Sequence, residues 1–257
     1  MLVAIDIGNT NITFGFFEKK SGKLINSGNL KTDISITTEE LAIFYKNIKN
    51  LWSINSEIEE EVIICSVVPQ LNYEFVHMFE KYFKVKPELI ENSNIPVNIE
   101  YDFPQEIGAD RLVNAYAGIK LYPKKNLIIV DFGTATTLDI IDKNKTYKGG
   151  IILPGIITSL RALETKTAKL PHIHLIKPEK VVGKNTVECI RSGIFNGQGG
   201  MIDELVKRIA KELNWDNYTV IATGGLSRVI KDFAFSIEVV EPYLTLYGIY
   251  NLWKEKN

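Results

Sequence analysis

Leu2-Val-Ala-Ile-Asp-Ile-Gly-Asn-Thr-Asn11 leads directly into a second apolar run, Ile12-Thr-Phe-Gly-Phe-Phe17. Two apolar runs joined by a short polar segment with a glycine predict two strands and a tight turn. The polar residues 9–11 lie where side chains and backbone N–H groups can converge on an anion such as phosphate. Asp6 ends the first strand and can hold a metal-bound water, because Mg2+ prefers carboxylate, water and phosphate oxygens. An ordinary hairpin with turn-stabilising Asp and Asn is the alternative.

A second copy of this pattern favours the ligand-binding interpretation. Asn126-Leu-Ile-Ile-Val-Asp-Phe-Gly-Thr134 again runs from an apolar strand into Asp-x-Gly and a hydroxyl residue, and a further apolar run follows. The two Asp-x-Gly turns, at Asp6 and at Asp131, align without a gap. One such unit opens each half of the chain, so we predict a duplicated protein with a ligand between its halves, a common place for small-molecule pockets.

Length and charge limit the classes of function. The 257 residues are enough for one large domain or for two of about 130 residues each. A formal net charge of −1 argues against a general nucleic-acid or membrane-surface binder. No apolar run approaches the length of a membrane span, and Met1 leads into a strand without a basic leader. Two cysteines, Cys65 and Cys189, fit a reducing compartment, so we expect a cytoplasmic protein without nucleic-acid or membrane partners.

The order of elements in the first half is typical of an α/β protein. After the opening hairpin, residues 23–30 predict a third strand, and the capping box Thr37-x-x-Glu40 predicts the start of a helix. Residues 61–68 predict a buried strand, and Pro69 suits the first turn of the helix that follows. Strands followed by helix, strand and helix indicate α/β organisation.

A further helix is expected to begin near Asp110, within Ile107-Gly-Ala-Asp-Arg-Leu-Val-Asn-Ala-Tyr-Ala-Gly118. Helix N-termini attract anions, and Arg111 offers planar hydrogen bonds to a carboxylate or phosphate. A negatively charged ligand could dock here. The alternative is that Asp110 only complements the helix dipole and pairs with Arg111. We place the join between the halves at residues 122–125, which gives domains 1–122 and 123–257.

The second half contains further glycine-rich segments. Thr186 is expected to open a helix, which we expect the glycines of residues 197–200 to interrupt. Residues 219–227 predict a strand, a Gly-Gly turn and a helix, and such a turn lets the backbone approach a nucleotide closely. Residues 244–254 predict a short amphipathic C-terminal helix.

Two apparent motifs carry less weight. In an extended segment His172 and His174 would share a face and could bind zinc, but no third ligand is nearby in the sequence, and we interpret them as a surface feature. Gly183-Lys-Asn-Thr186 looks like the end of a P-loop. Pro178 stands where that motif requires its first glycine, so a P-loop is excluded.

Taken together, the motifs resemble those of the type III pantothenate kinases over nearly the whole chain. They occur in order and at similar spacing: Asp6-x-Gly-Asn-Thr10, Gly108-Ala-Asp-Arg111, Asp131-x-Gly-Thr-Ala-Thr136, Gly149-Gly150 with Pro154-Gly155, Gly183-Lys-Asn-Thr186, Thr223-Gly-Gly225 and Leu246-x-Gly248. The resemblance implies the acetate and sugar kinase, Hsp70 and actin fold, with two ribonuclease-H-like halves flanking a nucleotide cleft. It also implies a phosphotransferase with an alcohol group as acceptor, which phosphorylates pantothenate with ATP in the first step of coenzyme A synthesis. A homodimer that needs Mg2+ and a monovalent cation, potassium or ammonium, is implied as well.

The resemblance also implies roles for individual residues. An ATP-phosphate loop would comprise Asp6, Ile7, Gly8, Asn9, Thr10, Asn11, Ile12 and Thr13, with Thr134 as a further contact. Asp131 would bind the monovalent cation, and Asp110 would accept the proton of the substrate hydroxyl. Pantothenate would contact Tyr101, Gly108, Ala109, Asp110, Arg111 and, across the dimer interface, Thr186. Some relatives carry Lys where this chain has Thr13, and a hydroxyl does not replace an ammonium charge.

The physical setting adds one expectation and leaves two alternatives. A helix N-terminus and Arg111 beside Asp110 would both favour its ionised form and make it a weaker base. A nucleotide-binding transcriptional accessory protein of the same fold, without kinase activity, is one alternative, although Asp6, Asp110 and Asp131 are all present. A ribonuclease-H-like nuclease is the other. It would need more clustered acids and a basic groove.

Overall fold

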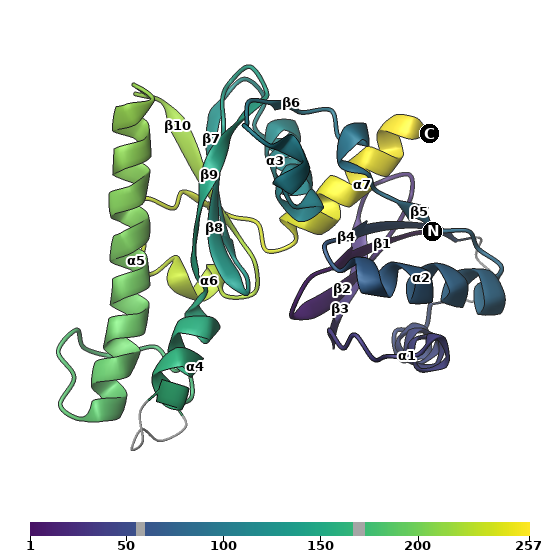
Figure 1. The fold of residues 1–257 in the computed structure, drawn as a ribbon, viewed down its shortest axis with the longest axis horizontal. Helices are drawn as coiled ribbons and strands as arrows, with labels where there is room; N and C mark the ends of the chain where they lie inside the picture. The colour runs from purple at the N-terminus through teal and green to yellow at the C-terminus, as the bar shows by residue number, and fades with distance from the viewer. Residues whose placement is uncertain (55–59, 167–172) are drawn as a thin grey trace. The chain divides into compact units, whose positions relative to one another are not determined.

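The computed structural model describes residues 1–54, 60–166 and 173–257. Two sheets organise the chain, each in its own unit (Figure 1). Unit 1 consists of residues 1–96, 103–117 and 245–257, and unit 2 consists of residues 97–102 and 118–244. Unit 1 thus combines the first part of the chain with its last helix.

The sheet of unit 1 has five strands in the order β3-β2-β1-β4-β5. The predicted hairpin pairs β1 with β2 antiparallel, and Asp6 lies opposite Thr13. Strand β4 runs parallel to β1, so the carboxyl ends of both strands meet at the same edge of the sheet. The strands are β1 (Leu2–Ile7), β2 (Asn11–Phe17), β3 (Leu24–Lys31), β4 (Glu61–Ser66) and β5 (Glu88–Leu89).

The sheet of unit 2 repeats this arrangement. Its order, β11-β10-β7-β8-β9-β6, matches that of the first sheet when β7 is aligned with β1, and β6 is added beside β9. The second Asp-x-Gly hairpin joins β7 to β8 antiparallel, and β10 runs parallel to β7. The predicted duplicated α/β fold is therefore confirmed. The strands are β6 (Asn98–Ile99), β7 (Asn126–Phe132), β8 (Ala135–Ile141), β9 (Thr146–Pro154), β10 (Tyr218–Thr223) and β11 (Val239–Val240).

Helices cover one face of the first sheet. Alternate residues of a strand share a face, so Phe14 and Phe16 of β2 lie on the same side. Phe14 and Phe16 pack in one core with residues of α1 (Thr38–Leu51) and α2 (Pro69–Met78). Thr37 forms the predicted capping box, and Pro69 lies in the first turn of α2. A π-helical turn, Phe79–Phe83, continues α2, and 3-10 turns follow at Asn92–Asn94 and Pro104–Glu106.

The final helix, α7 (Leu244–Lys256), explains why unit 1 includes the end of the chain. Phe17 of β2 stacks on Tyr250 with ring centroids 5.1 Å apart. Gly248 lies so close to α3 (Ala109–Leu121) that a Cβ there would be 2.6 Å from the carbonyl oxygen of Val113. These contacts join segments that are far apart in the sequence. The units therefore differ from the expected halves 1–122 and 123–257, which a single join would separate.

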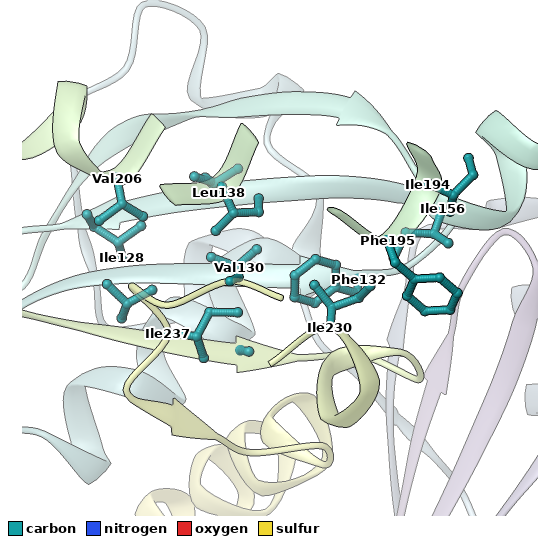
Figure 2. Close-up of a cluster of buried hydrophobic side chains, with 14 of the residues drawn as sticks. Ile128, Val130, Phe132, Leu138, Ile156, Ile194, Phe195, Val206, Ile230 and Ile237 are labelled. Carbon is teal, nitrogen blue, oxygen red and sulfur yellow. The ribbon is translucent and has the colours of Figure 1, made fainter. Parts of the chain in front are cut away.

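The core of unit 2 lies between its sheet and the helices α4 (Ile156–Lys166), α5 (Thr186–Glu212) and α6 (Ser227–Ile230). Figure 2 shows Phe132 of β7 near Phe195 of α5 and Ile230 of α6, and Val130 of the same strand belongs to the same core. This core positions the Asp131 hairpin, because its strand β7 is buried at the centre of the sheet. Among the described residues, no helix has the length and apolar character needed to cross a membrane.

The predicted break in α5 is wrong. The helix runs continuously through residues 197–200, although each glycine in a helix interior costs up to about 1 kcal/mol relative to alanine. Gly199 allows a close contact instead: a Cβ there would lie 2.0 Å from the carbonyl oxygen of Phe233. Tertiary packing thus overrides the local propensity of the glycines.

Candidate active site

The loop after β1 is built by the hairpin and held by a neighbouring segment. Gly8 donates its N–H to the carbonyl oxygen of Asn11 at 3.1 Å, which closes the turn. Thr32 contacts the loop twice: its N–H donates to Thr10 O at 2.9 Å, and its hydroxyl donates to Gly8 O at 2.6 Å. Residues 9–11 are exposed at the tip. Their polar side chains and backbone are therefore accessible to an anion.

Two side chains of this loop are not accessible to a ligand. Ile7 and Ile12 are fully buried in the core of unit 1, where they lie opposite each other on β1 and β2. Only their backbone groups remain for a ligand. Asp6 and Thr13, the next pair on the ladder, are half-buried.

Asp110 lies in the first turn of α3, as predicted. Its Oδ1 accepts the backbone N–H of Arg111 at 2.8 Å. A Cβ at Gly108 would be only 2.4 Å from the same oxygen, so the carboxylate lies directly against this glycine. The segment before the helix is held by Asn92, whose Nδ2 donates to Ile107 O at 2.7 Å. The half-buried carboxylate thus has a defined orientation.

Cys65 lies near both Asp6 and Asp110. It is fully buried on β4 and lies opposite Asp6 in the ladder with β1. Burial raises the pKa of its thiol well above the usual range, and the negative charges of Asp6 and Asp110 raise it further. Both carboxylates therefore lie near the same thiol, at the carboxyl ends of β1 and β4. The structure brings together the loop and the helix start that the sequence singled out.

The prediction that Asp110 is a weaker base than an ordinary aspartate is wrong. Its pKa is raised above the ordinary aspartate value, because loss of solvent around the carboxylate outweighs the stabilising hydrogen bond and charge of Arg111. The helix start and Arg111 act in the predicted direction, but they are the smaller effects. Asp110 is a stronger base than an exposed aspartate.

In unit 2 the second hairpin is packed closely against two glycines. A Cβ at Gly155 would be 2.3 Å from Thr134 O, and Thr158 donates its hydroxyl to the same oxygen at 2.7 Å. Gly224, with φ of +87°, follows β10, and a Cβ there would be 2.5 Å from Asp131 Oδ1 and 2.7 Å from Phe132 O. The sequence indicated a close backbone approach at the turn that contains Gly224. It did not indicate that Asp131 is what Gly224 approaches.

The two oxygens beside Gly224 allow a test of the implied cation site. Asp131 Oδ1 and Phe132 O both lie directly against Gly224, at 2.5 and 2.7 Å from where a Cβ would stand, so the two oxygens are close neighbours. Carboxylate and carbonyl oxygens are the donors that alkali and alkaline-earth cations prefer. These residues therefore fit a monovalent cation. Asp6 fits Mg2+ held through water, which needs only one or two carboxylates beside the phosphates.

Tyr101 and Thr186 belong to different segments of unit 2. Tyr101 follows β6, is 38% exposed and packs against Tyr147 of β9. Thr186 is the first residue of α5 and lines a cavity of about 720 Å³ with Gly183, Lys184 and Cys189. Asn185 caps the helix by accepting the N–H of Glu188 at 2.9 Å.

Of the two histidines interpreted as a surface feature rather than a zinc site, His172 lies outside the described residues. Within residues 1–54, 60–166 and 173–257, no group of three His, Cys, Asp or Glu side chains is arranged to hold a metal ion. A site completed by phosphate and water oxygens, as suggested for Asp6, does not require such a group.

Comparison with known proteins identifies related sequences. Residues 2–208 match the family model of type III pantothenate kinase. The chain is 43% identical over 255 residues to a type III pantothenate kinase of Bacillus cytotoxicus, covering 99% of this chain and 96% of that protein.

Solved structures resemble the fold at low sequence identity. A protein of Campylobacter jejuni assigned to the Baf family of transcriptional activators superposes with a TM-score of 0.62 at 20% identity, covering 99% and 98% of the two chains. One of Sinorhizobium meliloti assigned as 2-dehydro-3-deoxygalactonokinase gives 0.60 at 10% identity, with 100% and 96% covered. These likenesses agree with the fold of actin-like ATPases and sugar kinases. By its sequence match along nearly its whole length, the chain belongs to the type III pantothenate kinase family.

Proposed function

We propose that this chain phosphorylates pantothenate with ATP to give 4′-phosphopantothenate, with Asp110 as the group that accepts the hydroxyl proton. Family membership supports the reaction, which is the first step of coenzyme A biosynthesis. One observation carries the assignment of Asp110: its carboxylate has a defined orientation at the start of α3, near Asp6 and the exposed loop. A phosphate-binding loop and a base are thus close together in one unit.

The proposed ATP contacts begin with the loop from Asp6 to Thr13. The exposed tip, residues 9–11, offers N–H groups and polar side chains, while Ile7 and Ile12 can contribute only backbone. Thr134 is a further proposed ATP contact, supported by its exposed position at the tip of the second hairpin. Thr13 offers a hydroxyl in place of an ammonium group, so the loop relies on N–H donors and Mg2+ to neutralise phosphate charge.

The acceptor is proposed to bind through Tyr101, through residues 108–111 and through Thr186. Arg111 provides the charge that a carboxylate such as that of pantothenate needs. Gly108 leaves room beside the Asp110 carboxylate, and the buried Ala109 fixes the first turn of α3. Thr186 is exposed at a cavity and is proposed to reach the substrate of a second copy in a homodimer.

Two cations complete the proposal, with Asp6 holding Mg2+ through water and Asp131 holding potassium or ammonium. When bound, they would neutralise charge on the transferred phosphoryl group. Phosphoryl transfer depends mainly on positioning and on such neutralisation, because its transition state is loose. Asp110 therefore orients the hydroxyl and accepts its proton late. Its raised pKa makes it better suited to accept that proton.

A cytosolic location is also part of the proposal, supported by two free cysteines.

The activity is tested by ADP release measured with and without pantothenate, and with and without potassium. We expect release to require pantothenate and to increase with potassium. Release that does not depend on pantothenate would instead identify another kinase or an ATPase of this fold. No release under any condition would favour the non-catalytic alternative.

The cation site is tested separately by Asp131→Asn. Loss of the carboxylate charge beside Gly224 should abolish activation by potassium while the protein stays folded. The measurement is the potassium dependence of ADP release, with potassium-dependent thermal stabilisation of the protein as a readout independent of activity. Unchanged potassium dependence in both measurements would reject the assignment.

A further inference from the structure

A buried hydrogen-bonded pair lies in the sheet of unit 2, outside the residues assigned so far. Tyr147 of β9 and Asp139 of β8 are both fully buried, and the Tyr147 hydroxyl donates to Asp139 Oδ1 at 2.7 Å. Thr137 donates its hydroxyl to the other carboxylate oxygen at 3.3 Å. Burying a carboxylate is costly unless it is hydrogen-bonded, so this arrangement contributes little net stability but fixes the geometry strongly.

Tyr101 packs against Tyr147, the tyrosine of this pair. Its ring packs edge-on against the ring of Tyr147, with centroids 6.2 Å apart and an interplanar angle of 65°. Gly149 faces the same ring: its φ of +117° favours glycine, and an added Cβ there would just reach the ring, at 3.8 Å from Tyr101 Cδ2 and Cε2. Tyr101 is thus held on one side and remains 38% exposed on the other.

The backbone that carries Tyr101 is fixed by the same strand. Residues of β6 pair parallel with β9, and Glu100 donates its N–H to Tyr147 O at 2.9 Å. Lys148 pairs with the side chain of Glu100. Both the backbone before Tyr101 and the surface under its ring therefore depend on Tyr147 and its neighbours on β9.

We propose that Tyr147 and Asp139 are positioning residues, which hold the Tyr101 ring in the orientation that binds the acceptor substrate. The inference rests on the proposed function, because Tyr101 is assigned to pantothenate there. The Tyr147 hydroxyl fixes its own ring through Asp139, and the edge-to-face contact transmits this orientation to Tyr101. Asp139 and Tyr147 do not touch substrate in this scheme.

The test compares Tyr147→Phe with the matched variant Tyr45→Phe. Tyr45 is also fully buried and donates its hydroxyl to a carboxylate, Glu60 Oε2, at 2.8 Å, but it belongs to the core of unit 1. Both variants lose one buried phenol–carboxylate hydrogen bond. We expect Tyr147→Phe to raise KM for pantothenate about 3- to 10-fold, since one hydrogen bond is involved, with KM for ATP unchanged. Tyr45→Phe should leave both KM values unchanged.

Two further variants separate positioning from other effects. Asp139→Asn retains an oxygen that accepts the Tyr147 hydroxyl, so its KM for pantothenate should stay close to that of the unmodified chain. In a double-mutant cycle, Tyr147→Phe should add nothing once Tyr101→Ala is present, because Tyr147 acts through Tyr101. If Tyr147→Phe does not fold, Asp139→Leu carries the same test, because it removes the acceptor of the Tyr147 hydroxyl.

The outcomes distinguish this inference from the proposed function. An unmodified chain without pantothenate-dependent ADP release would overturn the proposed function. With that activity present, equal KM values in Tyr147→Phe and Tyr45→Phe would overturn the positioning role alone. Additive effects in the double-mutant cycle would overturn it as well.

Discussion

Asp110 illustrates how contacts from different parts of the chain set the chemistry of one residue. Its place in the first turn of α3 follows from the local sequence, and the hydrogen bond from Arg111 N is equally local. Its surroundings are not local, because Cys65 comes from β4 and Asp6 from β1. Sequence reasoning could therefore place the carboxylate and name its charged neighbour. It could not predict the loss of solvent that raises the pKa.

The raised pKa of Asp110 predicts how stability changes with pH. A carboxyl whose pKa is higher in the folded state stabilises the fold below its unfolded pKa, and this contribution is lost as pH rises through the folded pKa. Asp110→Asn removes the charge but keeps an oxygen for Arg111 N. We expect the variant to have a higher Tm than the unmodified chain at pH 7, with the difference shrinking toward pH 4. An equal or lower Tm of the variant at pH 7 would contradict the pKa direction.

At the scale of elements, the two hairpins were predictable and the long helix was not. Alternating apolar residues and an Asp-x-Gly turn specify a hairpin locally, and both hairpins formed at the expected residues. Helix α5 depends instead on packing, since Gly199 lies against the backbone of Phe233. The close approach of Gly224 to Asp131 has the same origin: two segments separated by more than half of the second unit meet at adjacent strands.

The packing of α5 predicts opposite effects for two adjacent glycines. Gly199→Ala should destabilise the protein by about 1–3 kcal/mol, because its Cβ would collide with a backbone oxygen. At Gly200 an added Cβ would meet no atom of the described residues within 4 Å apart from its own stretch of helix, so Gly200→Ala should be neutral or stabilising by up to about 1 kcal/mol. Urea unfolding of both variants measures the difference. Equal stability of the two would show that Gly199 is not needed for close packing.

For the whole molecule, the duplication was predictable from the sequence. Which residues belong to which of the two units was not. Two aligned motifs were enough to predict two related sheets, and the strand order confirms them. The allocation of residues 97–102 to unit 2 and of α7 to unit 1 depends on long-range pairing. Strand β6 joins the edge of the second sheet through β9, and α7 packs against α3. No local pattern in the sequence encodes either contact.

The most direct test of the central claim is the formation of 4′-phosphopantothenate from ATP and pantothenate by the unmodified chain and by Asp110→Asn. We predict product formation by the unmodified chain and a fall in kcat of about 10²- to 10⁴-fold in the variant, the usual contribution of a general base. ATP binding measured by calorimetry should change little, because the phosphate loop after β1 remains intact. Absence of product from the unmodified chain, or full activity of Asp110→Asn, would contradict the account.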